Sequence, residues 1–213
     1  MDLGVGGNVN RTDFGKLAKR RPAPCRRASA RCEQGFTLVE MVITLVVAAI
    51  LFAVAIPSFN NLINSNRLTT GANALIGALN TARMEAIKRN GSVQFCSNIA
   101  STNTTDTLGS ACGTNAGAVF VQTGTATAST VLAPPSALSI PSVKVRGTIA
   151  AIRFNGTGVG YAPGSTTPFG SGTGTTVVEL CSTAMKTNND VQVNMATGSI
   201  ITSSSPTTVV TCP

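Results

Sequence analysis

The stretch that decides the fold is Gly35-Phe36-Thr37-Leu38-Val39-Glu40, and it is followed by the apolar run Met41–Ile56. From Phe36 to Ile56 the only charged side chain is Glu40. Because a helix rises about 1.5 Å per residue, this segment predicts a helix roughly 31 Å long, enough to cross a bilayer core of about 30 Å. A carboxylate in such a helix is costly in lipid, so Glu40 requires a partner and indicates function.

The basic residues Arg26, Arg27 and Arg31 lie just upstream and favour a cytoplasmic N-terminus. Net charge is +8, but residues 1–35 carry eight Lys/Arg against three acids, so +5 of it lies before Phe36. Residues 36–213 carry eight Lys/Arg against five acids, which leaves +3. The overall basicity is therefore weak evidence for nucleic-acid binding by residues 36–213.

After Pro57 the sequence turns amphipathic, with apolar residues at three- and four-residue steps from Phe59 to Ile87. Lys88 and Arg89 suit a helix C-terminus, and Asn90-Gly91 suits the stop. This stripe predicts a helix that packs on a sheet, with Arg67 and Arg83 solvated on the outside.

From Ser92 onward the apolar period changes to two, which predicts short strands behind the helix. Turn-rich segments at 97–117, 155–156 and 163–175 separate them, and Thr197-Gly198 is typical of a hairpin tip. We therefore predict an α+β fold in which one long helix packs on one or two antiparallel sheets. The predicted strands are 92–96, 118–122, 142–145, 148–154, 176–181, 191–195, 199–202 and 207–211.

The glycine, the glutamate five residues later and the long apolar run resemble the N-terminal signature of type IV pilins and type II secretion pseudopilins. The resemblance implies that a prepilin peptidase cuts after Gly35 and methylates Phe36. It implies that Glu40 pairs with the N-terminal amine of a neighbouring subunit, and that Pro57 kinks the helix. It also implies a leader at 1–35, a membrane span at 36–57 and a periplasmic pilin-like domain at 58–213, anchored in the inner membrane.

The segment Leu79–Asn90, the following Val93-Gln94-Phe95-Cys96 and Ile152–Gly158 resemble the GspH/FimT branch of this superfamily. That branch implies a minor pilin or pseudopilin that primes or caps a filament, with other pilins or pseudopilins as partners. Whether the filament is a pilus or a secretion pseudopilus stays open. The alternative is DNA reception, because DNA-binding FimT-type members carry Gly-Arg-x-Arg. Here the hairpin has Gly198-Ser199-Ile200-Ile201, so we expect no specific DNA binding.

Six cysteines divide into two groups. Cys25 and Cys32 fall in the predicted leader, whereas four others would face the periplasm, where disulfides persist. Of the three connectivities that four cysteines allow, we favour Cys96–Cys112 and Cys181–Cys212, because each pair brackets a turn-rich or hairpin-like segment. A zinc site is disfavoured, since the chain has no histidine and no Cys-x-x-Cys spacing.

The same composition argues against an enzyme and against a resident metal or cofactor. General acid-base and nucleophilic catalysis need paired groups within reach of each other. Beyond Glu40, residues 36–213 offer only four scattered acids. The glycines of Asn155–Gly160 do not introduce a helix, so a phosphate-binding loop is not expected. The acids are Glu85, Asp106, Glu179 and Asp190.

Overall fold

A computed structural model describes residues 35–172, 175–209 and 211–213. Apart from Gly35, the predicted leader, including Cys25, Cys32 and the upstream arginines, lies outside the described residues. The described chain divides into two units at Leu45, with residues 35–44 in the first and Leu45–Pro213 in the second. All of the strands belong to the second unit, which the following paragraphs describe together with the long helix.

The long helix α1 spans Leu38–Arg89 and continues through Pro57. Its C-terminus forms the predicted stop. Asn90 adopts a positive φ of 45°, and the Gly91 amide donates to the Ala86 carbonyl at 3.1 Å. The Asn90 amide donates to the Ile87 carbonyl, which completes the double hydrogen bond of a Schellman motif. Basic residues in the last turn, Lys88 and Arg89, match the negative end of the helix dipole.

The first sheet has the strand order β3-β2-β1-β5-β6 and is antiparallel throughout. Two of its strands, β3 and β6, were not predicted. β3 has no buried residue and reads Ala-Ser-Thr-Val-Leu, and β6 has only two residues, so neither carries an apolar alternation. The predicted strand 148–154 is shorter than expected. The strands are β1 Val93–Phe95, β2 Val119–Gln122, β3 Ala128–Leu132, β5 Ile152–Phe154 and β6 Gly160–Tyr161.

The second sheet has the order β4-β7-β8-β9 and is also antiparallel. Its strands are β4 Val143–Arg146, β7 Thr176–Ser182, β8 Asp190–Ala196 and β9 Ile200–Ser203. The predicted strand 207–211 was wrong: Thr207 makes only one isolated bridge, with Asp190. Pro206 has no N–H to continue a ladder, and side chains hold this segment instead. Asn189 bonds the main chain of Val209 in both directions.

The segments between strands contain short helices where only turns were expected. These are the 3-10 turns η1 Ala100–Asn103 and η2 Ser136–Ser139 and the helix α2 Thr107–Cys112. Asp106 caps α2, because its carboxylate accepts from the Gly109 amide. Six residues are too short for a sustained apolar period, so the sequence pattern gave little signal for α2.

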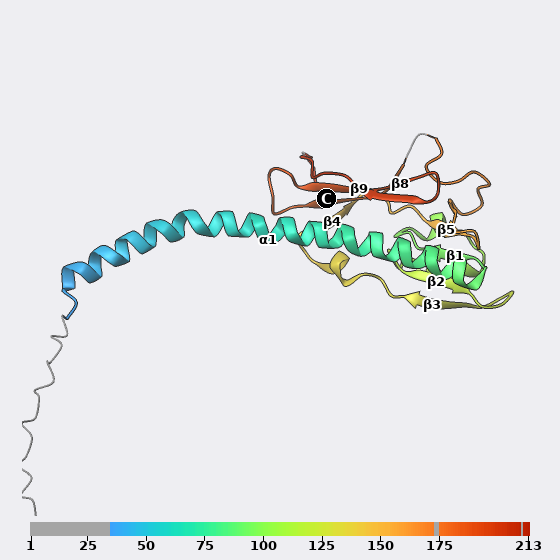
Figure 1. The fold of residues 1–213 in the computed structure, drawn as a ribbon, viewed down its shortest axis with the longest axis horizontal. Coiled ribbons are helices and arrows are strands. Elements are labelled where there is room, and N and C mark those ends of the chain that lie inside the picture. Colours follow the sequence, from blue (N-terminus) through green and yellow to red (C-terminus); the bar gives the residue numbers. More distant parts are fainter. Residues whose placement is uncertain (1–34, 173–174, 210) are drawn as a thin grey trace, which may run out of the picture. The chain divides into compact units, whose positions relative to one another are not determined.

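One hydrophobic core joins the two sheets to the second half of α1. Its largest members include Leu68, Leu75 and Leu79 from the helix and Phe95 and Phe154 from the first sheet. Val143, Leu180 and Val193 extend it into the second sheet. Figure 1 shows β8 and β9 running along one side of this part of α1, and β1, β2 and β3 along the other. The α+β arrangement of a long helix on antiparallel sheets is confirmed.

Candidate functional site

The start of α1 is a capped helix end. Gly35, Phe36 and Thr37 precede it, and all three are exposed. The Thr37 hydroxyl accepts from the Glu40 amide at 3.2 Å, and the Thr37 carbonyl accepts from the Met41 amide. Thr37 therefore satisfies a donor that a helix N-terminus leaves free. The spacing Thr-x-x-Glu is the sequence signal of this cap, and sequence reasoning overlooked it.

Glu40 lies in the first turn of α1 with its side chain exposed. Among the described residues, no hydrogen bond or ion pair involves its carboxylate. A negative charge in the first turn is favoured by the helix dipole. The carboxylate is thus free to accept a cation from outside the chain.

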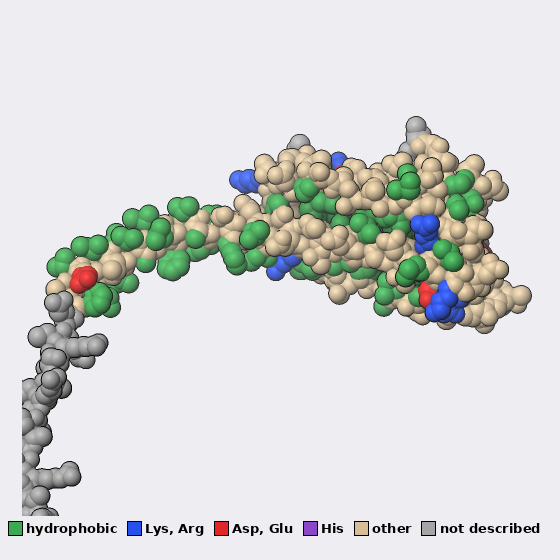
Figure 2. Space-filling view, in the orientation of Figure 1, with side chains coloured by type: hydrophobic (Ala, Val, Ile, Leu, Met, Phe, Trp, Pro, Cys, Tyr) green, Lys and Arg blue, Asp and Glu red, His purple; other side chains and the backbone are tan. Residues whose placement is uncertain are grey.

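The first half of α1 presents an apolar surface all round. Large apolar side chains between Phe36 and Leu62 are at least half exposed, among them Leu38 at 81% and Val54 at 72%. A window of this helix has a mean hydropathy of 2.8 and is long enough to span a membrane. In Figure 2 hydrophobic side chains cover the visible face of this segment, interrupted by the acidic side chain near its start. A soluble monomer rarely leaves so large an apolar surface uncovered.

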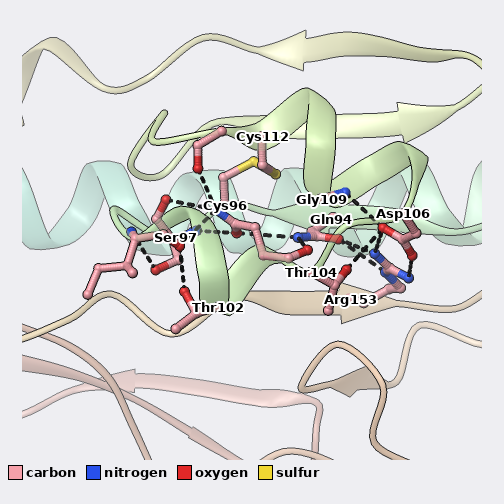
Figure 3. Close-up of a disulfide and its surroundings, with 12 residues drawn as sticks. Gln94, Cys96, Ser97, Thr102, Thr104, Asp106, Gly109, Cys112 and Arg153 are labelled. Carbon is pink, nitrogen blue, oxygen red and sulfur yellow. Dashed lines mark hydrogen bonds and ion pairs between the residues drawn. A yellow bond between two sulfur atoms is a disulfide. The ribbon is translucent and has the colours of Figure 1, made fainter.

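Both disulfides join the pairs that the sequence favoured. Cys96 and Cys112 are bonded across 16 residues, and Cys181 and Cys212 across 31. The first links the end of β1 to α2, and it lies beside a hydrogen-bond network shown in Figure 3. In that network buried Asn103 accepts from the Ser97 amide at 2.8 Å and donates to the Gly113 carbonyl at 2.9 Å. The four bonded cysteines leave no free thiol for metal binding within the described residues.

Asp106 and Arg153 form an ion pair beside this disulfide, with one contact of 2.9 Å (Figure 3). Arg153 also donates to the Gln94 side chain at 3.2 Å. The Arg153 hydrogen bond lowers the pKa of Asp106 to about 2, and the Gly109 amide acts in the same direction. The contacts tie β5 and β1 to the start of α2, so Arg153 has a structural role here.

Asp190 is the buried acid of the second sheet. It opens β8 opposite Cys181, and its side chain is fully buried. One carboxylate oxygen accepts from the Thr207 hydroxyl at 3.2 Å, while the other has no hydrogen-bond partner. Burial, followed by the nearby Glu179 carboxylate, raises the pKa of Asp190 to about 6. This pair of acids is compensated by the Arg146 guanidinium, which pairs with Glu179.

The hairpin tip between β8 and β9 is docked on the domain. Thr197 and Gly198 both adopt positive φ, 50° and 67°, which confirms the predicted turn. Gly198 is buried, and its amide donates to the Phe169 carbonyl at 2.7 Å. Arg83 donates to the Ser199 carbonyl at 3.0 Å. The expectation that Arg83 is simply solvated was therefore wrong, because this long-range bond fixes it.

Two arginines of the domain are engaged in separate ion pairs. Arg146 and Arg153 lie in different sheets and pair with Glu179 and Asp106, respectively. Ile201, which stands at an arginine position of the DNA-binding motif, packs against the hydrophobic core. Among the described residues no group of three His, Cys, Asp or Glu side chains could hold a metal ion.

Comparisons with known families agree with this geometry. The family model described as "Type II transport protein GspH" matches residues 71–198, which runs from the buried half of α1 to the hairpin tip. The model described as "Prokaryotic N-terminal methylation motif" matches residues 30–56. No curated protein and no solved structure showed significant similarity to the chain. The fold, the N-terminal signature and the extent of the first match show that the chain belongs to the GspH family of type IV pilin-like proteins.

Proposed function

We propose that this minor pilin or pseudopilin primes or caps a periplasmic filament as a structural subunit without a catalytic step of its own. The observation that carries the proposal is the exposed Glu40 carboxylate, which has no partner among the described residues and lies five positions after Gly35. Once Gly35 is removed, the new N-terminal amine of Phe36 would be the cation that a neighbouring subunit's Glu40 meets. Such a pair is strongly favoured in lipid, where neither charge is solvated.

Maturation follows from the same segment. Prepilin peptidase would cut between Gly35 and Phe36 and methylate Phe36. Residues 36–57 would then span the inner membrane, with residues 58–213 in the periplasm, where both disulfides can persist. Pro57 would provide a kink near the membrane surface, because it removes one helical hydrogen bond. Its partners would be the peptidase, the inner membrane and other pilins or pseudopilins.

The filament could belong to a type II secretion system or to a type IV pilus, and we propose the first. The description of the matched family, a type II transport protein, favours a secretion pseudopilus over a pilus. DNA reception is the second candidate, because the family includes FimT-type proteins. The docked hairpin and the lack of arginine at Ser199 and Ile201 argue against it.

The test is Glu40→Ala, compared with Glu85→Ala on the same helix. Glu85 is matched in residue type but is already paired with Lys88 and Arg89. We expect Glu40→Ala to insert and fold but to enter filaments poorly, while Glu85→Ala enters at the wild-type level. Immunoblots of sheared filaments and crosslinking to neighbouring subunits measure incorporation. Equal incorporation of both variants would refute the role of Glu40.

Processing is tested on Gly35→Val in the same cells. The mature mass of the unmodified protein should correspond to an N-methylated Phe36, and the variant should stay as precursor in the membrane. A mature N-terminus at another residue would contradict the proposed cleavage site.

A further inference from the structure

The cationic side chains of residues 36–213 separate into two groups. Five of the eight are engaged within the domain: Lys88 and Arg89 with Glu85, Arg146 with Glu179, Arg153 with Asp106, and Arg83 with the Ser199 carbonyl. The other three, Arg67, Lys144 and Lys186, are exposed and make no ion pair with any described residue. Side chains without an ion-pair partner in the domain can attract an anionic partner from outside it.

These three cations lie toward the end of the domain where α1 enters it, on different sides of the domain: strand alternation sends Lys144 to the face of β4 opposite Val143, and Val143 faces α1. Gly71, one turn after Arg67, packs against β4 and β7: a Cβ there would lie 3.7 Å from Val143 and 3.3 Å from Leu180. Lys144 follows Val143 and pairs in register with Cys181, at the end of β7. Lys186 lies in the β7–β8 connection, five residues further along the chain. Figure 2 shows Lys and Arg side chains at the end of the domain where α1 enters it.

A cleft of about 630 Å³ lies at the same end, between α1 and the β7–β8 connection. Amide and hydroxyl side chains of Asn60, Asn61 and Ser65 line it from the helix, and residues 184–188 line it from the connection. Apart from Lys186, the lining contains no charged side chain. The buried Asp190 follows the connection, but it faces Glu179, Arg146 and Thr207 rather than solvent.

The position of this cleft along α1 gives its level relative to a bilayer, and this step rests on the proposed span at 36–57. A headgroup layer extends about 5–8 Å beyond the hydrocarbon core. At about 1.5 Å per residue, Asn60 and Asn61 stand roughly 5–6 Å beyond Pro57, within that layer. The β7–β8 connection lines the same cleft and lies near the same level. Arg67 stands roughly 15 Å beyond Pro57, outside that layer, so Arg67 and Lys144 act on the membrane through its surface potential, which extends about a Debye length into the solvent.

We propose that this end of the domain, formed by Lys186 and the cleft beside Asn60, docks on the anionic phosphate headgroups of the membrane in which the chain is anchored, with Arg67 and Lys144 adding attraction at longer range. Unpaired cations next to a membrane span attract anionic lipids, and neutral amide donors complete the hydrogen bonding of phosphate oxygens. The docked state would hold the domain against the membrane before the subunit enters a filament. Extraction into the filament would have to break these contacts.

The experiment uses the full mature chain in lipid nanodiscs, with a tryptophan as the probe. Because the chain has no tryptophan, Ala184→Trp places a unique fluorophore at the cleft. Ile200→Trp, at a position 59% exposed on β9, is the control away from the cleft. We expect a headgroup-bound nitroxide quencher to quench the first probe more strongly in discs that contain phosphatidylglycerol than in discs of phosphatidylcholine. The second probe should not distinguish the two lipids.

Paired charge removals then test the cations. If a cation at the headgroups favours the docked state about fivefold, Lys186→Gln should lower the docked-to-free ratio roughly fivefold, and Lys144→Gln added to it should lower the ratio further by a smaller factor. Lys88→Gln with Arg89→Gln removes the same charge away from the cleft and should leave the ratio unchanged. Molar salt should act like the first pair, and free inorganic phosphate should not substitute for the lipid.

The outcomes separate this inference from the proposed function. A chain that does not insert into the discs would overturn both. A chain that inserts, but whose cleft probe is quenched equally in both lipids, would overturn the docking alone. Quenching that disappears when each disc holds only one copy would assign this end of the domain to another subunit and would also overturn the docking.

Discussion

The two halves of α1 belong to one continuous helix but are stabilised by different surroundings. From Leu38 to Arg67 none of its side chains is buried. From Leu68 to Ala86 eight positions are buried against the sheets, including Leu75 and Leu79 with no exposed surface. The first half is the more apolar of the two, so hydrophobicity alone does not decide which half enters the domain core. The spacing of the apolar residues along the helix decides which half is buried in the domain.

The comparison shows what each half requires. The second half has an apolar stripe that one domain can cover, and its small residues Gly71, Ala72 and Ala78 allow close approach of the strands. The first half is apolar on every side, and a sheet can cover only one side. It requires lipid or neighbouring helices all round, as expected for a segment that passes from a membrane into a filament.

The largest effect on stability should come from replacing a leucine by alanine in the second half of α1, with the same replacement in the first half as the control. Leu79→Ala opens a cavity in the core and should lower the free energy of unfolding by about 2–5 kcal/mol. Leu51→Ala, in the exposed half, should leave it unchanged within about 0.5 kcal/mol. Calorimetric unfolding in detergent micelles measures both. A similar loss of stability in the two variants would contradict this difference between the halves, because it would mean that the first half also supports the domain.

Removing a disulfide should weaken the second half alone. Cys181→Ser with Cys212→Ser opens a loop of 31 residues and should cost about 3–4 kcal/mol, while the 16-residue loop of Cys96–Cys112 should cost about 3 kcal/mol. Hydrogen exchange should then show lost protection from Leu68 to Arg89 and unchanged protection before Arg67. Equal loss along all of α1 would contradict independent support of the halves.

The stability of the domain that covers the second half of α1 should depend on pH, because the buried acid Asp190 lies in that domain. The pKa of Asp190 is raised to about 6, first by burial and then by Glu179. Between pH 4 and 6 the folded state therefore binds more protons than the unfolded state, and stability falls as pH rises, by at most about 3 kcal/mol. The asparagine of an Asp190→Asn variant stays neutral, so the free energy of unfolding of this variant should change less between pH 4 and 6.

Thermal unfolding from pH 4 to 7 measures this difference. Asp106 has the opposite sign, because its pKa is lowered to about 2. The stability that it contributes is lost only as the pH falls below 4, outside the range of the experiment. A wild-type domain that gains stability from pH 4 to 7 would show that Asp190 is not the controlling group.

The sequence predicted the elements whose patterns are long or chemically specific. The apolar run and the Asn90-Gly91 stop depend on local spacing, and the structure has them. The apolar stripe predicted from Phe59 to Ile87 is buried only from Leu68 to Ala86, because the sheets do not reach its ends, where Phe59 and Ile87 are exposed. Elements held by long-range contacts were missed. The strand β3 has no apolar alternation, and the Arg83 bond to Ser199 joins residues 116 positions apart. At the N-terminus the motif directed attention to Gly35 and Glu40, whereas the Thr-x-x-Glu signal of the Thr37 cap, visible in the sequence, was overlooked.

The smallest expected effect concerns DNA, and the docked hairpin changes how it must be tested. Arginines at Ser199 and Ile201 would restore the spacing of the DNA-binding motif. Ile201, however, packs on the core, so arginine there would disturb the fold. Ile200 is 59% exposed and takes an arginine without that cost. A matched control is Ser199→Gln with Ile200→Gln, which adds polar side chains without charge.

The unmodified protein should bind duplex DNA no more tightly than about 10⁻⁴ M at physiological salt, because its remaining free cations are few and lie away from the hairpin. Ser199→Arg with Ile200→Arg should raise the affinity by less than about tenfold. Each arginine that reaches a phosphate should steepen the salt dependence by nearly one unit, and the glutamine control should show neither change. Fluorescence anisotropy against salt measures both quantities. Micromolar binding by the unmodified chain, with a steep salt slope, would make the domain half of the molecule a DNA receptor as well as a support for α1.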